Sequence, residues 1–106
     1  MQLNWLQKEA SALSESFPEK MVLFDCETTG GSAKYHRIIE VGLIVIENGE
    51  IVETWQSFCD PERPLPKTIQ TLTGISPTNL CGAPLFSDIA DKLFRFLTER
   101  VLVAHN

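Results

Sequence analysis

Two stretches of the chain repeat apolar residues with the period of an α-helix. In residues 1–20 the apolar positions recur at steps of three and four until Pro18 stops the pattern, which predicts an amphipathic N-terminal helix. The second stretch follows Pro84, a residue that suits the first position of a helix. Its apolar stripe, which we expect to face a core, consists of Phe86, Ile89, Ala90, Leu93, Phe94 and Leu97.

Four other stretches predict β-strands. Residues 21–24 are apolar without interruption, which is typical of a strand buried on both faces, although a buried helical turn gives the same pattern. Residues 38–46 are rich in β-branched side chains, and residues 51–58 alternate as a half-buried edge strand does. Residues 101–104 are again apolar, and the helix before them lets this strand run parallel to the first.

Glycine and proline residues mark the connections. Asn48-Gly49 joins the second and third strands and suits the central positions of a type I′ hairpin turn. Residues 60–66 are interrupted by prolines and form a connection without regular structure. A short helix is predicted over residues 68–72, with Gly74 at its end. The predicted order is therefore one helix, three strands, two helices and a last strand.

Length and charge restrict the kind of protein. One hundred and six residues fit one small domain, and the net charge is −5. This charge argues against a basic nucleic-acid cradle and predicts weak affinity for long nucleic acid, although bound cations can meet phosphate instead. Cys26, Cys59 and Cys81 are odd in number and lack metal-site spacing, which indicates reduced thiols in a cytosolic protein. We expect no membrane segment, because no stretch is long and apolar enough.

Two acidic residues follow the first predicted strand. If the chain stays extended, Asp25 and Glu27 leave the same side of the strand, roughly 6.6 Å apart along it, and Cys26 points to the opposite face. If the two carboxylates converge to about 4 Å, their charges repel each other by about 4 kcal/mol near a protein surface, and a bound cation offsets this repulsion. Ligands that are all oxygen select a hard metal, Mg²⁺ or Mn²⁺. The alternative is a pair of solvated acids at the end of a strand.

Other charged residues near this pair have two interpretations. Lys34, His36 and Arg37 lie in the polar loop that follows, where they either meet a substrate phosphate or form a solvated surface. Glu40 lies inside the second predicted strand, and we expect it to make a structural hydrogen bond rather than to bind metal.

The acidic pair and its surroundings resemble a known enzyme family. Asp25-Cys-Glu-Thr-Thr-Gly30 and the closing Leu102-Val-Ala-His-Asn106 resemble the first and second motifs of the DEDD (DnaQ-like) 3′–5′ exonucleases. The similarity is greatest to the proofreading epsilon subunit of bacterial DNA polymerase III. Residues 37–42 and 72–76 lie between the motifs in the family's order. Residues 21–106 therefore look like the N-terminal portion of an exonuclease domain, which residues 1–20 precede.

The resemblance implies a fold and a chemistry. The implied fold is α/β, a ribonuclease-H-like mixed sheet with flanking helices, in which an antiparallel three-strand meander is joined by a parallel strand. Asp25 and Glu27 would be the catalytic residues and would bind Mg²⁺ or Mn²⁺, with two ions in the intact parent protein. The substrate would be a single-stranded or frayed 3′ end of DNA, with RNA left open, and the partner a polymerase or a repair protein. Residues expected beside the terminal nucleotide are Thr28, Thr73, Gly74 and Ile75.

The chain also departs from the family. The family supplies two further aspartates and a catalytic His or Tyr after the second motif, whereas this sequence ends at Asn106. We therefore expect activity of the intact parent and none of the 106-residue chain alone. One alternative is a non-catalytic module on the same fold that binds nucleic acid or protein, which the missing acids favour. The other is a phosphohydrolase of the haloacid-dehalogenase type, which would have Asp in place of Glu27.

Overall fold

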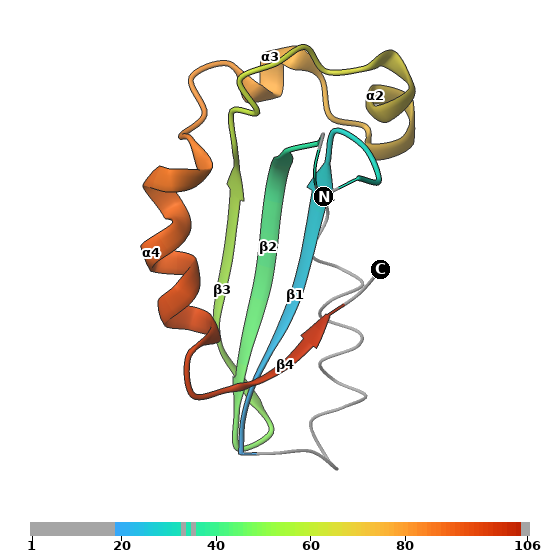
Figure 1. Cartoon of the computed structure of the whole chain (residues 1–106). Coiled ribbons are helices and arrows are strands. Elements are labelled where there is room, and N and C mark those ends of the chain that lie inside the picture. Colours follow the sequence, from blue (N-terminus) through green and yellow to red (C-terminus); the bar gives the residue numbers. More distant parts are fainter. Residues whose placement is uncertain (1–18, 33, 35, 105–106) are drawn as a thin grey trace.

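The computed structural model describes residues 19–32, 34 and 36–104 (Figure 1). Its elements in chain order are β1 (Lys20–Thr28), β2 (Ile38–Glu47), β3 (Glu50–Phe58), α2 (Lys67–Thr73), α3 (Pro77–Leu80), α4 (Phe86–Leu97) and β4 (Val101–Ala104). Most of the helix predicted over residues 1–20 lies outside the described residues, and so do His105 and Asn106 of the second motif. The first described strand begins at Lys20.

The strands form one mixed sheet in the order β3-β2-β1-β4. β2 pairs antiparallel with both β1 and β3, and β4 lies parallel to β1, so the predicted meander with an added parallel strand is confirmed (Figure 1). The turn between β2 and β3 has positive φ at Asn48 (52°) and Gly49 (80°), as the predicted type I′ turn requires. β3 lies at one edge of the sheet, as predicted, but its burial does not alternate: no residue of β3 is buried, and the neighbours Ile51 and Val52 are 45% and 52% exposed.

β2 and the first half of β1 form the centre of the sheet. Every residue of β2 from Ile39 to Ile46 is buried, and so are the three residues Met21, Val22 and Leu23 of β1. Burial of each large apolar side chain contributes roughly 1.5–3 kcal/mol. The acidic end of β1 is therefore carried by the most firmly anchored part of the sheet.

Helix α4 covers one face of the sheet (Figure 1). Leu93 and Phe96 of the helix join a buried cluster with Val22, Leu43 and other residues of the central strands. The Phe96 ring also stacks on Trp55 of β3, with 5.7 Å between the ring centroids. Among the described residues, no helix has both the length and the apolar composition needed to cross a bilayer.

The predicted stripe of α4 is partly wrong. Phe94 is 69% exposed and Phe86 is 39% exposed, whereas Phe96 is buried. The buried line runs through Ile89, Leu93 and Phe96, and Phe94 lies about 100° around the helix from its neighbour Leu93. Which face of α4 turns inward depends on where the helix packs against the sheet. The sequence leaves this face ambiguous, because Phe residues lie on more than one side of the helix.

The sequence predicted Pro84 as the first residue of α4, and this prediction is wrong. Leu85 is the extended N-cap, and the helix begins at Phe86. The cause is a contact across the chain: the carbonyl oxygen of Pro84 accepts a hydrogen bond from the backbone N–H of Asp60 (2.8 Å), and Asp60 forms a parallel bridge with Leu85. This bridge holds the chain extended before the helix starts.

Helices α2 and α3 lie at the end of the sheet where β1 finishes (Figure 1). The predicted helix of residues 68–72 is confirmed as α2, and Gly74 ends it in the left-handed conformation with φ 75°. The sequence prediction missed α3. Its sequence signal was present. The Ser76 hydroxyl accepts from the backbone N–H of Asn79, the Asn79 side-chain oxygen accepts from the backbone N–H of Ser76, and Pro77 is the first residue of the helix.

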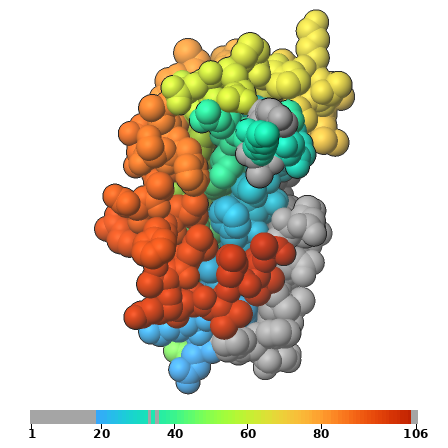
Figure 2. Space-filling view, viewed as in Figure 1, coloured from blue at the N-terminus to red at the C-terminus, as the bar shows by residue number. Residues whose placement is uncertain are grey.

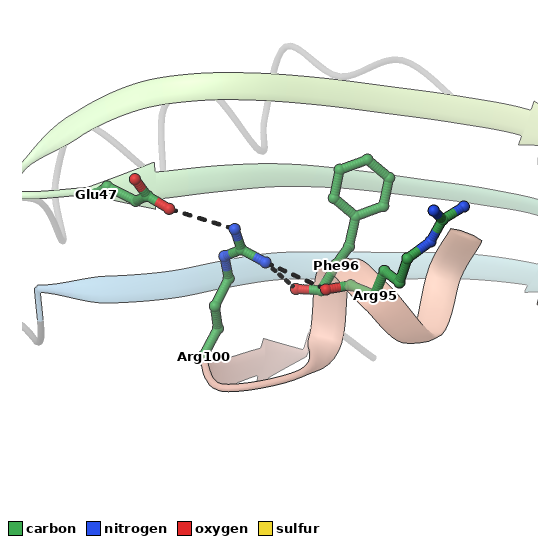
Figure 3. A network of polar contacts seen from close by, with 4 residues as sticks. All are labelled: Glu47, Arg95, Phe96 and Arg100. Carbon is green, nitrogen blue, oxygen red and sulfur yellow. Dashed lines mark hydrogen bonds and ion pairs between the residues drawn. The ribbon is translucent and has the colours of Figure 1, made fainter. Parts of the chain in front are cut away.

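At the opposite end of the sheet, Arg100 joins α4 to β2 (Figure 3). One guanidinium nitrogen of Arg100 donates to the carbonyl oxygens of Arg95 (3.3 Å) and Phe96 (2.9 Å), the last carbonyls of the helix. The second terminal nitrogen, Nη2, pairs with the Glu47 carboxylate at 3.2 Å. These contacts satisfy helix-end carbonyls and fix the turn that brings β4 alongside β1.

Candidate active site

Asp25 and Glu27 lie on one face at the end of β1, as their spacing predicted. The ladder places Asp25 opposite Gly42 and Glu27 opposite Glu40. Gly42 adds no side chain beside Asp25, whose Oδ1 accepts a hydrogen bond from the backbone N–H of Cys26 at 2.9 Å. Asp25 is only 8% exposed, so its carboxylate is buried within the fold rather than solvated at the surface.

Glu27 is affected by the acids around it. Burial raises the pKa of Glu27, and the neighbouring charges of Asp25 and Glu40 raise it further. Each of these causes disfavours the ionised carboxylate. The end of β1 therefore brings the charges of Glu27, Asp25 and Glu40 close together.

Glu40 takes the structural role predicted for it. Its side chain is completely buried, and Oε2 accepts a hydrogen bond of 2.6 Å from the side-chain amide of Gln56 on β3. This contact fixes Glu40 within the sheet, across the ladder from Glu27. The charge of Glu40 lies near Glu27, but its hydrogen bond to Gln56 indicates a structural role rather than metal binding.

Thr28 closes the turn that follows the acids. Its hydroxyl donates to the carbonyl oxygen of Gly30 and accepts a hydrogen bond from the backbone N–H of Gly30 (3.3 Å). The ladder to β2 shifts register between Glu27 and Thr28. Thr28 therefore lies beside the acids in sequence, but its position is set by the turn as well as by the sheet.

Thr73, Gly74 and Ile75 lie at the corner between α2 and α3. The Thr73 hydroxyl donates to the carbonyl oxygen of Ile69 (2.7 Å) and accepts from the backbone N–H of Ile75 (3.1 Å). Ile75 is 2% exposed and packs with Ile39 at the start of β2. The corner lies at the same end of the sheet as the acids (Figure 1). At this corner Gly74 is exposed, and a Cβ added to it would meet no other atom within 4 Å.

A cleft of about 930 Å³, which the sequence did not predict, opens on the other face of β1. Cys26 and Thr28, which alternate with the acids, line it, and neither acid does. Its other walls are residues 30–32 and 36–38 of the loop after β1 and, facing them, residues 60–62 and 85–87. Figure 2 shows these segments bordering a hollow beside the start of α4. Cys26 thus faces away from the acids, as predicted.

The acidic pair fits part of a site for a hard divalent cation. Carboxylate oxygens are the ligands that Mg²⁺ and Mn²⁺ prefer, and both carboxylates lie on one face. Within residues 19–32, 34 and 36–104, no three Asp, Glu, His or Cys side chains come close enough together to hold a metal ion. Asp25 and Glu27 therefore provide only some of the ligands that such a cation needs.

Comparison with known proteins identifies the family. The exonuclease family model, RNase_T, matches residues 22–106. The chain belongs to this exonuclease family. It is similar to the PolC-type DNA polymerase III of Halalkalibacterium halodurans, with 44% identity over 87 residues, and to the 3′–5′ exonuclease DinG of Staphylococcus haemolyticus, with 40% identity over 82 residues. Membership in this family excludes the haloacid-dehalogenase alternative.

These relatives are much longer proteins. The matched part is 82% of this chain but 6% of the polymerase, and 77% of this chain but 9% of DinG. Among solved structures, the product-bound form of exonuclease I has a TM-score of 0.73 at 15% identity, with 85% of this chain and 22% of that chain covered. The nuclease domain of 3′hExo, a DEDDh family member bound to rAMP, has a TM-score of 0.70 at 22% identity, with 86% and 54% covered. The fold is thus the ribonuclease-H-like exonuclease fold, of which this chain holds a part.

Proposed function

We propose that the complete protein is a metal-dependent 3′–5′ exonuclease that removes nucleotides from DNA 3′ ends, in proofreading or repair. The main support is the placement of Asp25 and Glu27 on one face at the end of β1, in a chain of the exonuclease family. DNA is favoured over RNA because the sequence relatives include DNA polymerases. A polymerase module is accordingly the expected partner, and the cytoplasm the expected location.

Asp25 and Glu27 are the proposed metal ligands, for Mg²⁺ or Mn²⁺. When bound, such cations activate water and stabilise the leaving oxygen of a phosphodiester. The sheet holds the Asp25 carboxylate in place, and a positive charge beside the pair would favour the ionised form of Glu27 and lower its pKa. Two ions and the remaining family acids would complete the site in the parent protein.

Thr28 and the corner between α2 and α3 are the proposed binding site for the terminal nucleotide. Thr28 lies directly after the acids. Gly74 is exposed at the end of α2, where its backbone N–H donates to the carbonyl oxygen of Gln70 and an added Cβ would meet nothing within 4 Å. The Thr73 hydroxyl is engaged within α2, and buried Ile75 anchors the corner to the core. Thr73 and Ile75 therefore contribute mainly by holding Gly74 in position.

The test is a digestion of 5′-end-labelled single-stranded DNA by the full-length gene product with Mg²⁺. We expect fragments that shorten stepwise from the 3′ end and release 5′-mononucleotides. Asp25→Asn should reduce the rate to background, whereas Asp91→Asn, which changes an exposed acid on α4, should leave it unchanged. Internal cleavage, or release from the 5′ end only, would overturn this proposal.

The 106-residue chain alone should be inactive in the same assay. It contains only two of the four acids of the DEDD motifs, and a two-metal site needs more ligands than these. Mg²⁺-dependent shortening of the DNA by this chain, abolished by Asp25→Asn, would contradict this expectation.

A further inference from the structure

The loop between β1 and β2 is closed at its base by Thr29. This residue is 2% exposed, and its hydroxyl accepts a hydrogen bond from the backbone N–H of Arg37 (3.0 Å) and lies 3.3 Å from Nδ1 of His36. The backbone N–H of Thr29 donates in turn to the carbonyl oxygen of Arg37 (2.9 Å). Three contacts thus join the first residue after β1 to the two residues before β2.

The His36 ring packs directly on Gly30. A Cβ placed on Gly30 would lie 2.4, 2.5 and 2.6 Å from three atoms of the ring, distances that real side chains do not reach. Gly30 does not have positive φ, so glycine is required here for close approach rather than for backbone conformation. At Gly31, by contrast, an added Cβ would meet nothing within 4 Å. The ring reaches Thr29 only because Gly30 has no side chain.

The same turn carries Thr28. Both hydrogen bonds of the Thr28 hydroxyl go to the backbone of Gly30, the residue on which His36 packs. The ladder shifts register directly before Thr28, so β2 holds Asp25 and Glu27 more regularly than it holds Thr28. Thr28 and His36 also line the same cleft. The position of Thr28 therefore depends on the contacts that Gly30 and Thr29 make with His36.

We propose that His36 is a positioning residue for the 3′-terminal nucleotide, because its ring, packed on Gly30 and against Thr29, holds the turn that presents Thr28. This role rests on the proposed function, in which Thr28 lies beside that nucleotide. The two acids belong to the regular part of the ladder between β1 and β2. Loss of His36 should therefore weaken substrate binding and leave the chemical step almost unchanged.

Steady-state kinetics of the full-length protein on a 3′-terminal DNA substrate test the role. For His36→Ala we expect KM to rise about fivefold, the factor that loss of one ordinary hydrogen bond gives, with kcat within about twofold of wild type. His36→Asn should recover most of the affinity, because its amide can meet the Thr29 hydroxyl where Nδ1 does. A fall in kcat with unchanged KM would show a loss of folded enzyme instead and would overturn the assignment.

Hydrogen exchange of the same full-length variants, followed by mass spectrometry, tests the contacts without reference to activity. His36→Ala should accelerate exchange in peptides that span residues 28–38 and leave those of β3 unchanged. Gly30→Ala should do the same, because its Cβ displaces the ring, and the double variant should be no faster than either single one. Gly31→Ala is the matched control and should exchange like wild type.

The two measurements separate the possible failures. If the wild-type protein had no 3′ exonuclease activity, the proposed function would be wrong. The hydrogen-exchange data would still test whether His36 holds the turn. Additive effects of Gly30→Ala and His36→Ala, or acceleration throughout the protein, would show that the ring does not hold this turn. Unchanged exchange in both variants would overturn the inference as well.

Discussion

The two faces of β1 are built from alternate residues and have opposite properties. On the face toward α4, Val22 and Phe24 pack into the apolar cluster beneath the helix. On the other face, buried Leu23 is followed by Asp25 and then by Glu27. One strand therefore combines a continuous apolar face with a face that turns from apolar to acidic.

The difference between the faces separates stability from function. The apolar face gains free energy from burial, whereas the acidic face keeps like charges together, and burial with Asp25 and Glu40 raises the pKa of Glu27. A group of neighbouring acids of this kind is expected where a ligand supplies positive charge. Changes on the apolar face should therefore cost stability, and changes on the acidic face should remove the response to metal.

The largest effect should come from the apolar face. Phe96→Ala should lower the free energy of unfolding by about 3–5 kcal/mol, because it leaves a cavity beneath α4. Phe94→Ala, two residues away on the same helix but 69% exposed, should change it by less than about 0.5 kcal/mol. Urea denaturation of the two variants measures both values. Equal losses would mean that α4 presents a different face to the sheet.

On the acidic face, the expected effect is the loss of stabilisation by metal. Mn²⁺ at a hundredfold excess over its dissociation constant should stabilise the wild type by about 2.7 kcal/mol, through preferential binding to the folded state. Asp25→Asn should respond little, and Glu50→Gln, a change of an exposed acid at the other end of the sheet, should respond as the wild type does. Thermal melts with EDTA and with Mn²⁺ measure the difference. The same Mn²⁺-induced shift in melting temperature in all three proteins would show that Asp25 does not bind the metal.

Local sequence signals predicted much of the fold and the common orientation of the two candidate acids. The uninterrupted apolar run predicted β1, Asn48-Gly49 predicted the hairpin, and Gly74 predicted the end of α2. The common orientation of Asp25 and Glu27 followed from the two-residue period of a strand. All of these features depend on residues that are close together in sequence.

Features that depend on contacts between distant residues were not predictable in this way. The start of α4 follows from the bridge between Asp60 and Leu85, which no local pattern encodes. The contact of His36 with Gly30 forms because the loop folds back on itself, and the sequence showed His36 only as one of three polar residues of the loop. The cleft on the second face of β1 has the same origin, since its walls come from separate segments.

The smallest effect concerns Glu27 in the absence of metal. Its pKa in the folded protein is raised above its ordinary value of 4.5, so the folded state binds a proton more readily than the unfolded chain does. The ionised carboxylate therefore opposes folding, by an amount that is absent at pH well below 4.5 and grows as the pH rises through the folded pKa. Glu27→Gln should consequently stabilise the metal-free protein at neutral pH, by about 1 kcal/mol or less because the side chain is partly exposed, and should have little effect in acid. Melts in EDTA at both pH values measure the difference. A variant that is less stable than wild type at neutral pH would show that the fold stabilises the charge of Glu27, and the two faces of β1 would then not differ as described.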